Sequence, residues 1–370
     1  MNTTGRHSAG GAEINALPWR RSRPPARVLA IRLHALGDTV LTLPYLHALR
    51  RLLPDTTLDF LTRREVADIP KNVILFDRVF DIGGGRDPRR QWLSALTLVP
   101  RLSLQRYDVI LDLQRNRLSR AIRILLNPRS WSEFDRFSPR LAGERTRATI
   151  EAAGLGPLEV RPDLVLRRKD MGSDKLRAAG WNGVSNLVVL NPAGAFPGRS
   201  WPLESYLRFA ELWLAQVSRA TQFVVLGLPA LGTRARYLKA RLGSRLLDLT
   251  GRTSPSEAFA VLQRAMLVLS EDSGLMHMAW VSGAPTLALF GASRSDWSRP
   301  HGNYSDCLRA CQRAEGVCIS DGHCHAGPPT CLQEVSPEAV VERARVLMRR
   351  VANEPRGIHP DGHPSAPEDR

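Results

Sequence analysis

The segment 270–291, SEDSGLMHMAWVSGAPTLALFG, places an acid, a hydroxyl, a glycine and an imidazole at the start of an expected helix. A buried apolar run precedes it, and apolar residues at helical spacing follow. The free N–H groups at such a helix start can bind a phosphate. Alternatively, an acid or hydroxyl there only caps the helix. The candidate site residues are Asp272, Ser273, Gly274 and His277.

A second chemically promising turn, HALGDT at 34–39, follows the first expected strand. Gly37 permits a tight backbone, and Asp38 stands at the carboxyl end of the strand where a helix begins. A carboxylate there either caps the helix or accepts a proton from an attacking hydroxyl as a general base.

Two further turns in the second half of the chain also follow expected strands. Arg199 is the one cation of the loop NPAGAFPGRSWP at 191–202, and a guanidinium can neutralise a diphosphate with two hydrogen bonds. The turn TGRTS at 250–254 could line a nucleotide base, which adds Thr253 and Ser254 to the candidates.

A cluster of cysteines is a candidate metal site. Thiolates and imidazoles at short spacing can bind zinc or iron, and His323 and His325 lie within the cluster. However, the spacing matches no common zinc finger, and reduced thiols in a compact loop are the favoured alternative. We therefore assign no metal and no cofactor. The structural candidates are Cys307, Cys311, Cys318, Cys324 and Cys331.

Two series of alternating strands and helices must position these residues. The first has strands at 27–33, 58–62, 79–82 and 109–113 and helices at 39–53 and 116–126. The second has strands at 186–191, 222–227, 246–249, 266–269 and 286–290 and helices at 203–216, 231–242, 255–264 and 337–351. Two such series predict two doubly wound α/β domains, with ligands at the carboxyl ends of the strands. The active site is then expected between the domains.

The composition suggests where the domains begin and end. The predicted parts are a disordered basic leader at 1–26, an N-terminal domain at 27–165, a linker at 166–185, a C-terminal domain at 186–352 with a Cys-rich loop at 307–331, and a disordered tail at 353–370. The leader lacks the apolar centre of a secretory signal. No apolar stretch approaches the ~20 residues needed to cross a bilayer, so we expect a soluble protein.

The charge is unevenly distributed. The chain has a net charge of +16, and residues 86–147 hold fourteen Arg against six acidic residues. Such an excess attracts polyanions, either an anionic membrane surface, a phosphorylated substrate or nucleic acid, or else it is a solvated surface. No nucleic-acid motif accompanies the charge, so we expect no nucleic-acid partner.

Four motifs in order resemble glycosyltransferase family 9, the ADP-heptose:lipopolysaccharide heptosyltransferases. They are ALGDTVLTLPYLHALR at 35–50, NPAGAFPGRSWPLESY at 191–206, LTGRTSPSEAFAVLQRA at 249–265 and SEDSGLMHMAWVSGAPTLALFGAS at 270–293. The resemblance covers about 27–350. It implies a GT-B fold, with two Rossmann-like domains facing each other across a cleft, and an inverting mechanism without a catalytic metal.

The resemblance also implies roles for the candidate residues. Asp38 would be the general base, and Asp272 would hold hydroxyls of the donor sugar. The amides of Ser273 and Gly274 would cradle the diphosphate, with His277 nearby.

Two departures from the family pattern concern the donor. Arg199 stands where relatives commonly have Lys, and either cation can offset charge on the leaving diphosphate. Relatives often place an acid after the strand at 222–227 to bind ribose, whereas GLPALGTRA at 227–235 has none. The second departure opens the question of the donor's identity.

We therefore expect a peripheral cytoplasmic enzyme that transfers heptose from ADP-heptose to an acidic lipopolysaccharide inner-core acceptor at the inner membrane. One alternative is a transferase of another nucleotide sugar, or one that modifies a protein. Another is a non-catalytic nucleotide- or nucleic-acid-binding protein, which only the basic stretch supports.

Overall fold

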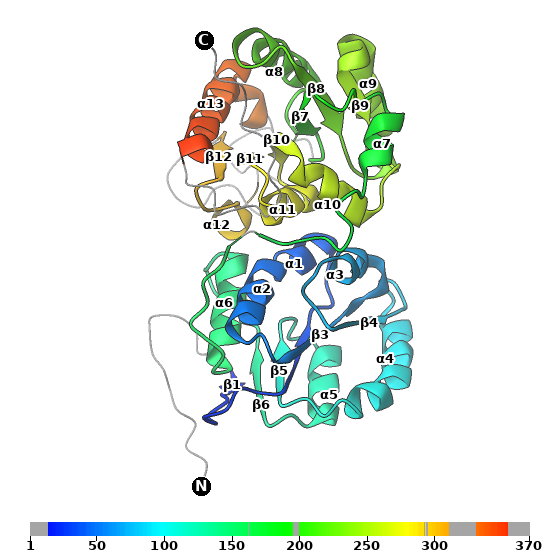
Figure 1. Cartoon of the computed structure of the whole chain (residues 1–370), viewed down its shortest axis with the longest axis vertical. Helices are drawn as coiled ribbons and strands as arrows, with labels where there is room; N and C mark the ends of the chain where they lie inside the picture. Colours follow the sequence, from blue (N-terminus) through cyan, green and yellow to red (C-terminus); the bar gives the residue numbers. More distant parts are fainter. Residues whose placement is uncertain are drawn as a thin grey trace.

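The chain folds into two α/β domains, one above the other in Figure 1. The computed structural model describes residues 14–161, 163–194, 200–291, 293, 295–310 and 331–353. Each domain is built on one six-stranded sheet. No helix in these ranges is long and apolar enough to span a membrane.

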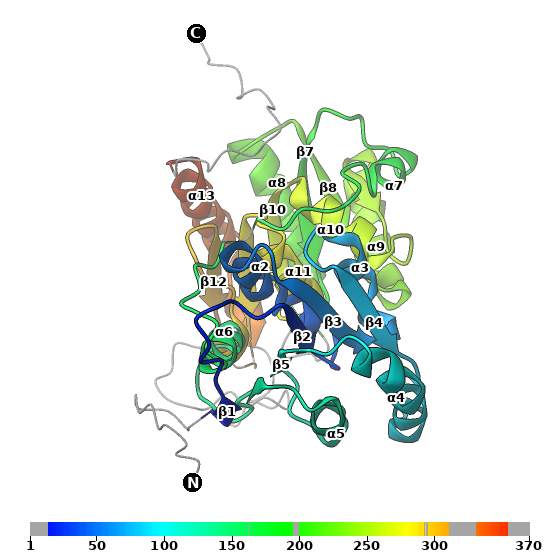
Figure 2. The same cartoon turned by 60° about the horizontal axis from the view of Figure 1, so that its bottom comes forward.

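The N-terminal sheet has the strand order β1-β6-β5-β2-β3-β4. Only β1 is antiparallel to its neighbour, and Figure 2 shows β2, β3 and β4 side by side. The chain runs outward from β2 to β4 and returns to the other side of β2, so the winding direction reverses between β2 and β5. The strands are β1 Ala16–Leu17, β2 Arg27–Ile31, β3 Thr57–Arg63, β4 Arg78–Ile82, β5 Val109–Asp112 and β6 Ser130–Glu133.

Helices cover both faces of this sheet. On one face lie α4 Pro88–Ser103 and α5 Arg117–Leu126, packed on Leu29 and Ile31 of β2. On the other face Val28 and Ala30 of the same strand meet the remaining helices. These are α1 Leu36–Val40, α2 Leu43–Leu52, α3 Asp68–Asn72 and α6 Ala142–Ala152, with the short 3-10 helix η1 Arg64–Val66 before α3.

The C-terminal sheet is wholly parallel, with the order β12-β11-β10-β7-β8-β9. Its winding reverses between β7 and β10. The strands are β7 Asn186–Asn191, β8 Thr221–Val225, β9 Leu246–Asp248, β10 Ala265–Glu271, β11 Thr286–Phe290 and β12 Ser305–Arg309.

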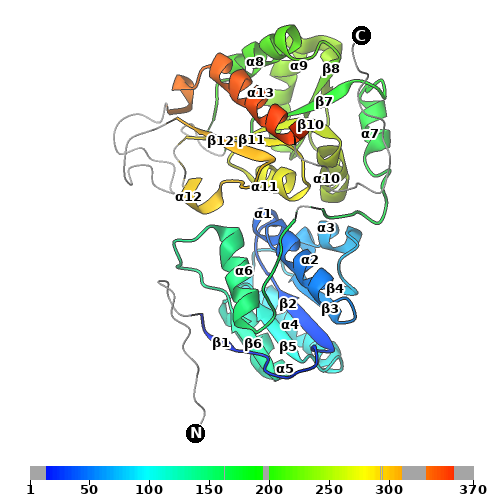
Figure 3. The same cartoon turned by 60° about the vertical axis from the view of Figure 1, so that its left-hand side comes forward.

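The C-terminal sheet is also covered on both faces. On the outer face, α13 Pro337–Asn353 packs against α8 Leu203–Gln216 (Figure 3), and α9 Gly232–Leu242 lies beside α8. On the other face lie α10 Pro255–Gln263 and α11 Gly274–Val281. The remaining short helices are α7 Ser173–Ala178, α12 Ser295–Ser298, η3 Pro229–Leu231, η4 Gly243–Arg245 and η5 Cys331–Glu334.

Four of these helices lie between the two sheets and join the domains (Figure 1). Helix α1 contacts α11, and α3 contacts α10. Ile69 of α3 and Phe259 of α10 belong to one buried apolar cluster. At the same contact, Oδ2 of Asp68 accepts a hydrogen bond of 2.6 Å from the backbone N–H of Ser256.

The predicted fold class, two doubly wound α/β domains, is confirmed. The predicted helix at 39–53 differs, since the structure has two helices that meet near Thr42. Pro44 lies at the start of α2, where it has no N–H to continue the bonding pattern of α1. Helix α1 also starts earlier than predicted, at Leu36, which places Asp38 inside its first turn.

The predicted disordered leader at 1–26 is wrong for its described part. Ala16 and Leu17 pair with β6, and the N–H of Trp19 donates to the carbonyl of Ala153 at 2.8 Å. Residues 1–13 and the tail from 354 lie outside the described residues. The sequence analysis also assigned no element to β6, α4, α6 or β12. Polar residues in β6 and Pro100 within α4 weaken their patterns.

Candidate active site between the two sheets

Two of the candidate residues, Asp38 and Asp272, follow strands at the winding reversals of the two sheets. Asp38 comes after β2, and Asp272 comes after β10. A doubly wound sheet binds ligands outside the carboxyl ends of its strands at this point, because the neighbouring connections leave in opposite directions. The helices that carry these residues, α1 and α11, are in contact.

Asp38 is held by two basic side chains of its own domain. Its Oδ1 accepts a hydrogen bond of 2.9 Å from Nη2 of Arg32, and its Oδ2 lies 2.5 Å from Nδ1 of His34. The carboxylate is 35% exposed, so it remains accessible to a ligand. The N-cap of α1 is Ala35, which excludes the alternative that Asp38 caps this helix.

These contacts fix the charge of Asp38. Burial alone would raise its pKa, but the hydrogen bond from His34 and the charge of Arg32 outweigh burial and hold the pKa well below its usual range. Burial lowers the pKa of Arg32, while the neighbouring Asp38 opposes that effect. Asp38 is therefore a carboxylate at neutral pH.

The start of α11 combines a cap with a buried amide. Oγ of Ser273 accepts from the N–H of Met276, so this hydroxyl does cap the helix. Nδ2 of Asn191, at the end of β7, donates to Oγ of both Ser270 and Ser273 at 2.8 Å. This bridge fixes the turn before α11 against the neighbouring strand.

The remaining residues of this turn are partly accessible. Gly274 is exposed, and Asp272 and His277 are half-buried. Burial lowers the pKa of His277, and the charges of Asp272 and Asp38 act in the opposite direction. The imidazole of His277 therefore lies close enough to one acid from each domain for both charges to affect its pKa.

The two domains meet at Gly37. A Cβ atom at this position would lie 3.0 Å from Cδ2 of His277 and 3.3 Å from Cα of Gly274. The absence of a side chain lets α1 approach the start of α11, and the turn that carries Asp38 lies directly against the turn that carries Asp272.

Glu271, which the sequence analysis missed, organises the loop at 191–202. It is fully buried at the end of β10. Its carboxylate accepts hydrogen bonds from the backbone N–H groups of Gly194 and Trp201, the latter at 2.6 Å, and from the hydroxyl of Tyr206 at 3.2 Å. Burial raises its pKa to about 7, against the opposing effect of these hydrogen bonds and of Arg234. The signal in the sequence was an acid at the end of an apolar strand.

Ser254 has a structural role. Its Oγ accepts from the N–H of Glu257, whose side chain accepts from the N–H of Ser254, which forms a capping box at the start of α10. Oδ2 of Asp68 accepts from the N–H of Ser256, so the N–H groups at this helix start already have acceptors from both domains. Thr253 is half-buried just before the cap. A role of either residue in donor binding stays a prediction.

Several other candidate residues lie outside the residues that the structure describes. Arg199, Cys311, Cys318 and Cys324 are among them. Cys307 is a free, half-buried cysteine in β12, and Cys331 begins η5. Within the described ranges no group of three or more His, Cys, Asp or Glu residues could hold a metal ion.

The sequence analysis missed four residues of this arrangement. Asn191 and Glu271 end their strands, and Arg32 and His34 flank Leu33 after β2. A polar residue at the carboxyl end of an apolar strand was the available signal for each, but only the tertiary structure shows their partners.

Comparisons with known proteins identify similar sequences and folds. The model of glycosyltransferase family 9 (heptosyltransferase) matches residues 141–324. Lipooligosaccharide heptosyltransferase 2 of Haemophilus influenzae is 25% identical over 170 residues, 45% of this chain and 49% of that protein. The chain therefore spans about half the length of this relative.

Solved structures match over nearly their whole length. A glycosyl transferase family 9 protein from Veillonella parvula has a TM-score of 0.76 at 18% identity, covering 88% of this chain and 97% of that one. The E. coli ADP-heptose lps heptosyltransferase II has a TM-score of 0.69 at 17% identity, covering 88% and 99%. The fold is that of these structures, and the predicted GT-B architecture is confirmed.

Proposed function

Because the chain belongs to glycosyltransferase family 9, we propose that it transfers heptose from ADP-heptose to an acidic lipopolysaccharide inner-core acceptor, with inversion and without a catalytic metal. The observation that carries this proposal is the contact of α1 with α11. It brings an ionised carboxylate, Asp38, against a helix start with an exposed glycine, Gly274.

The two sides of this contact have complementary chemistry. Asp38 receives the proton of an acceptor hydroxyl, and the hydroxyl oxygen bonds to the anomeric carbon of the sugar from the face opposite the diphosphate. The bond from the anomeric carbon to the diphosphate oxygen breaks, and its electron pair leaves with the nucleoside diphosphate. The N–H groups at the start of α11 and the guanidinium of Arg199 offset the charge on this leaving group.

Asp272 and His277 complete the donor side. Asp272 holds hydroxyls of the donor sugar, and the charges of both Asp272 and Asp38 act on His277. Glu271 places the two backbone positions, Gly194 and Trp201, that flank the segment with Arg199. A buried carboxylate in this position supports a site in which the loop ends are fixed before the donor binds.

The donor's nucleotide is the least supported part of the proposal. The similar E. coli structure is named an ADP-heptose enzyme, which favours ADP-heptose. The segment 226–235 holds no acid for a ribose, which keeps another nucleotide sugar open. A panel of nucleotide sugars under identical assay conditions distinguishes these donors.

The distribution of charge supports the proposed acceptor and its location. Residues 86–147 carry an excess of eight positive charges, which suits an anionic glycolipid at the cytoplasmic membrane face. In this proposal transfer to lipid acceptor falls with salt more steeply than donor binding does. Equal salt dependence would contradict the peripheral location.

The decisive experiment incubates the purified protein with ADP-heptose and a heptose-deficient core glycolipid, with and without EDTA. We expect a product heavier by one heptose in both samples, and ADP release in equal amount. Asp38→Asn should release ADP far more slowly than wild type yet still bind it in a calorimetric titration. A wild-type protein that binds ADP-heptose but modifies no core acceptor would contradict the proposed acceptor.

A further inference from the structure

A basic pocket lies in the N-terminal domain, beside the loop that carries Asp38. It is a hollow of about 530 Å³ at the start of α5. Four arginines and no acid line it, together with a few apolar side chains. The lining residues are Arg115, Asn116, Arg117, Arg120, Ala121, Ile124, Arg136 and Phe137.

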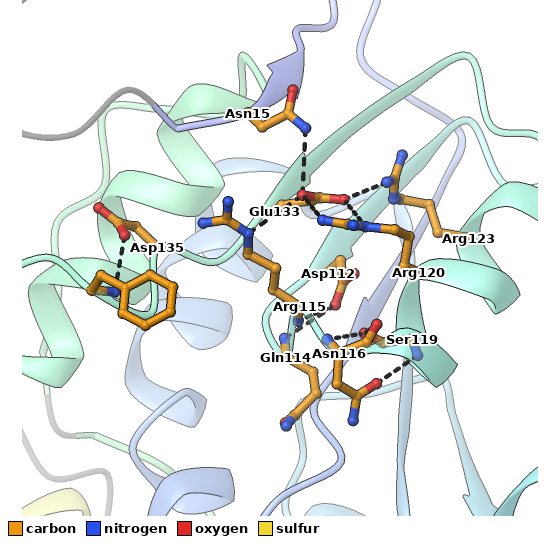
Figure 4. Close-up of polar contacts among 11 residues, drawn as sticks. Asn15, Asp112, Gln114, Arg115, Asn116, Ser119, Arg120, Arg123, Glu133 and Asp135 are labelled. Atoms are coloured by element: carbon orange, nitrogen blue, oxygen red, sulfur yellow. Dashed lines mark hydrogen bonds and ion pairs between the residues drawn. The ribbon is translucent and has the colours of Figure 1, made fainter.

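The turn between β5 and α5 carries Arg115 and is held by hydrogen bonds to Asp112. Oδ1 of buried Asp112 accepts from the N–H groups of Gln114 at 3.1 Å and Arg115 at 2.8 Å (Figure 4). Arg115 itself has a φ of 52°, in the left-handed region. A branched or long side chain adopts that conformation at a cost, so the backbone of this turn is strained in order to hold its shape.

Glu133 forms ion pairs with three arginines, two of which line the pocket (Figure 4). Its carboxylate receives two hydrogen bonds from Arg120, at 3.0 and 2.9 Å, and lies 3.5 Å from Nε of Arg115 and close to Nη2 of Arg123. Burial would raise the pKa of Glu133, but the hydrogen bond from Arg120 and the charges of Arg123 and Arg120 hold it below its usual range. The single negative charge of Glu133 thus holds three arginines in place, and the four residues together keep a net charge of +2.

Two more cations at the rim are unpaired. Arg117 and Arg136 are exposed, and neither forms an ion pair with any residue that the structure describes. Both line the same hollow as Arg115 and Arg120. Beside them, Ile124 is 62% exposed and Phe137 82% exposed. A concave surface with one sign of charge and apolar walls concentrates the electric field on a bound anion.

The pocket adjoins the site of proton transfer. The loops after β2 and β5 meet at the winding reversal of the N-terminal sheet, where the N–H of Leu33 donates to Oε1 of Gln114 at 3.1 Å. Arg32, which holds Asp38, also donates to the carbonyl of Leu113. The charge of Arg136 acts on Arg32 and contributes to its lowered pKa.

We propose that Arg115, Arg117, Arg120 and Arg136 bind a phosphoryl group carried by the acceptor and so place its hydroxyl near Asp38. Guanidinium groups suit phosphate because their planar N–H donors match its oxygens in pairs. Glu133 fixes the inner pair of cations in advance, while Arg117 and Arg136 are free to close on the ligand. The inference rests on the proposed function and names the feature by which the site selects its acceptor.

The kinetic test compares two double variants of equal charge change. R117Q/R136Q removes the two unpaired cations of the pocket. R161Q/R168Q removes two exposed arginines elsewhere, each in an ion pair with an acid two residues away in the sequence. We expect the KM for the phosphorylated acceptor to rise about tenfold or more in the pocket variant, the affinity for ADP to stay constant, and the control variant to match wild type. With the acceptor stripped of its phosphoryl groups, the two double variants should have the same KM.

A binding test needs neither donor nor turnover. Phenylglyoxal modification of the intact protein is mapped by mass spectrometry with and without inorganic phosphate. Phosphate should protect Arg117 and Arg136 but leave Arg161 and Arg168 unprotected. Protection without any heptose transfer would support the anion site while contradicting the proposed function. Transfer without protection, with equal KM values for both double variants, would overturn the anion site alone. Protection combined with an unchanged acceptor KM would show a site for free phosphate and overturn its assignment to the acceptor.

Discussion

Gly37 of the N-terminal domain lies against His277 of the C-terminal domain so closely that a Cβ atom on Gly37 would stand 3.0 Å from the imidazole Cδ2. This contact places the turn that carries Asp38 close to the turn that carries Asp272. It also explains why glycine stands inside α1, where alanine is a better helix former.

Gly37→Ala should therefore lower the transferase activity without lowering the thermal stability. Alanine favours the local helix by up to about 1 kcal/mol, yet its methyl group pushes α11 away from α1. We expect an unchanged or higher Tm and a transferase rate lowered about tenfold, measured by calorimetry and by ADP release. Gly232→Ala in α9 is the matched control, since its nearest atom would be 3.7 Å away. Equal rates for the two variants would show that the contact has no role in turnover.

Asp38→Asn should lower kcat by roughly a hundredfold to ten-thousandfold, the range for loss of a general base. The asparagine keeps the size of the side chain but cannot accept the proton. ADP binding by titration calorimetry should remain, because the proposed donor contacts lie on the other domain. A variant that kept most of its turnover would exclude Asp38 as the base.

The pH dependence of the wild-type enzyme should reflect the lowered pKa of Asp38. A carboxylate with such a pKa stays ionised until the pH falls well below its ordinary value of 3.8. We expect kcat/KM to show no acid limb from this group near pH 4. His34→Ala removes the hydrogen bond to Oδ2, raises the pKa of Asp38 and moves the acid limb to higher pH.

His34→Asn tests how the imidazole acts. The asparagine amide can donate to Asp38 from a place close to that of Nδ1. If His34 only positions the base, this variant should keep the activity and the pH profile of wild type. Loss of activity in His34→Asn to the level of His34→Ala would instead show that the imidazole passes the proton on.

Glu271 should make the stability of the C-terminal domain fall as the pH rises. Its pKa is about 7 in the folded protein against an ordinary 4.5, so the folded state holds the proton more tightly. The resulting stabilisation, on the order of 3 kcal/mol, is complete below pH 4.5, declines between pH 4.5 and 7, and is absent above. Denaturant unfolding of wild type and Glu271→Gln across this range measures it. The difference in unfolding free energy between the two proteins should change with pH, and parallel curves would exclude this titration.

The sequence predicted most of the central strands because buried parallel strands are continuous apolar runs. Strands β2, β7 and β11 lie where these runs predict them. Strands β6 and β12 escaped prediction, because SWSE and SDCLR contain few apolar residues. The break between α1 and α2 depended on Pro44, a local signal that was available but outweighed by the helical spacing around it.

The sequence by itself determined the class of fold and the turns in which the candidate residues lie, since a strand end, a glycine and an acid are local features. It could not determine which turns meet. Asp38 and His277 are far apart along the chain, and only the packing of α1 on α11 brings their charges within reach of each other. In the same way, Glu133 is one acid among arginines in the sequence, and only the adjacency of β5 and β6 places it beneath Arg115 and Arg120. Electrostatic effects depend on distance and burial, and the tertiary structure alone decides both.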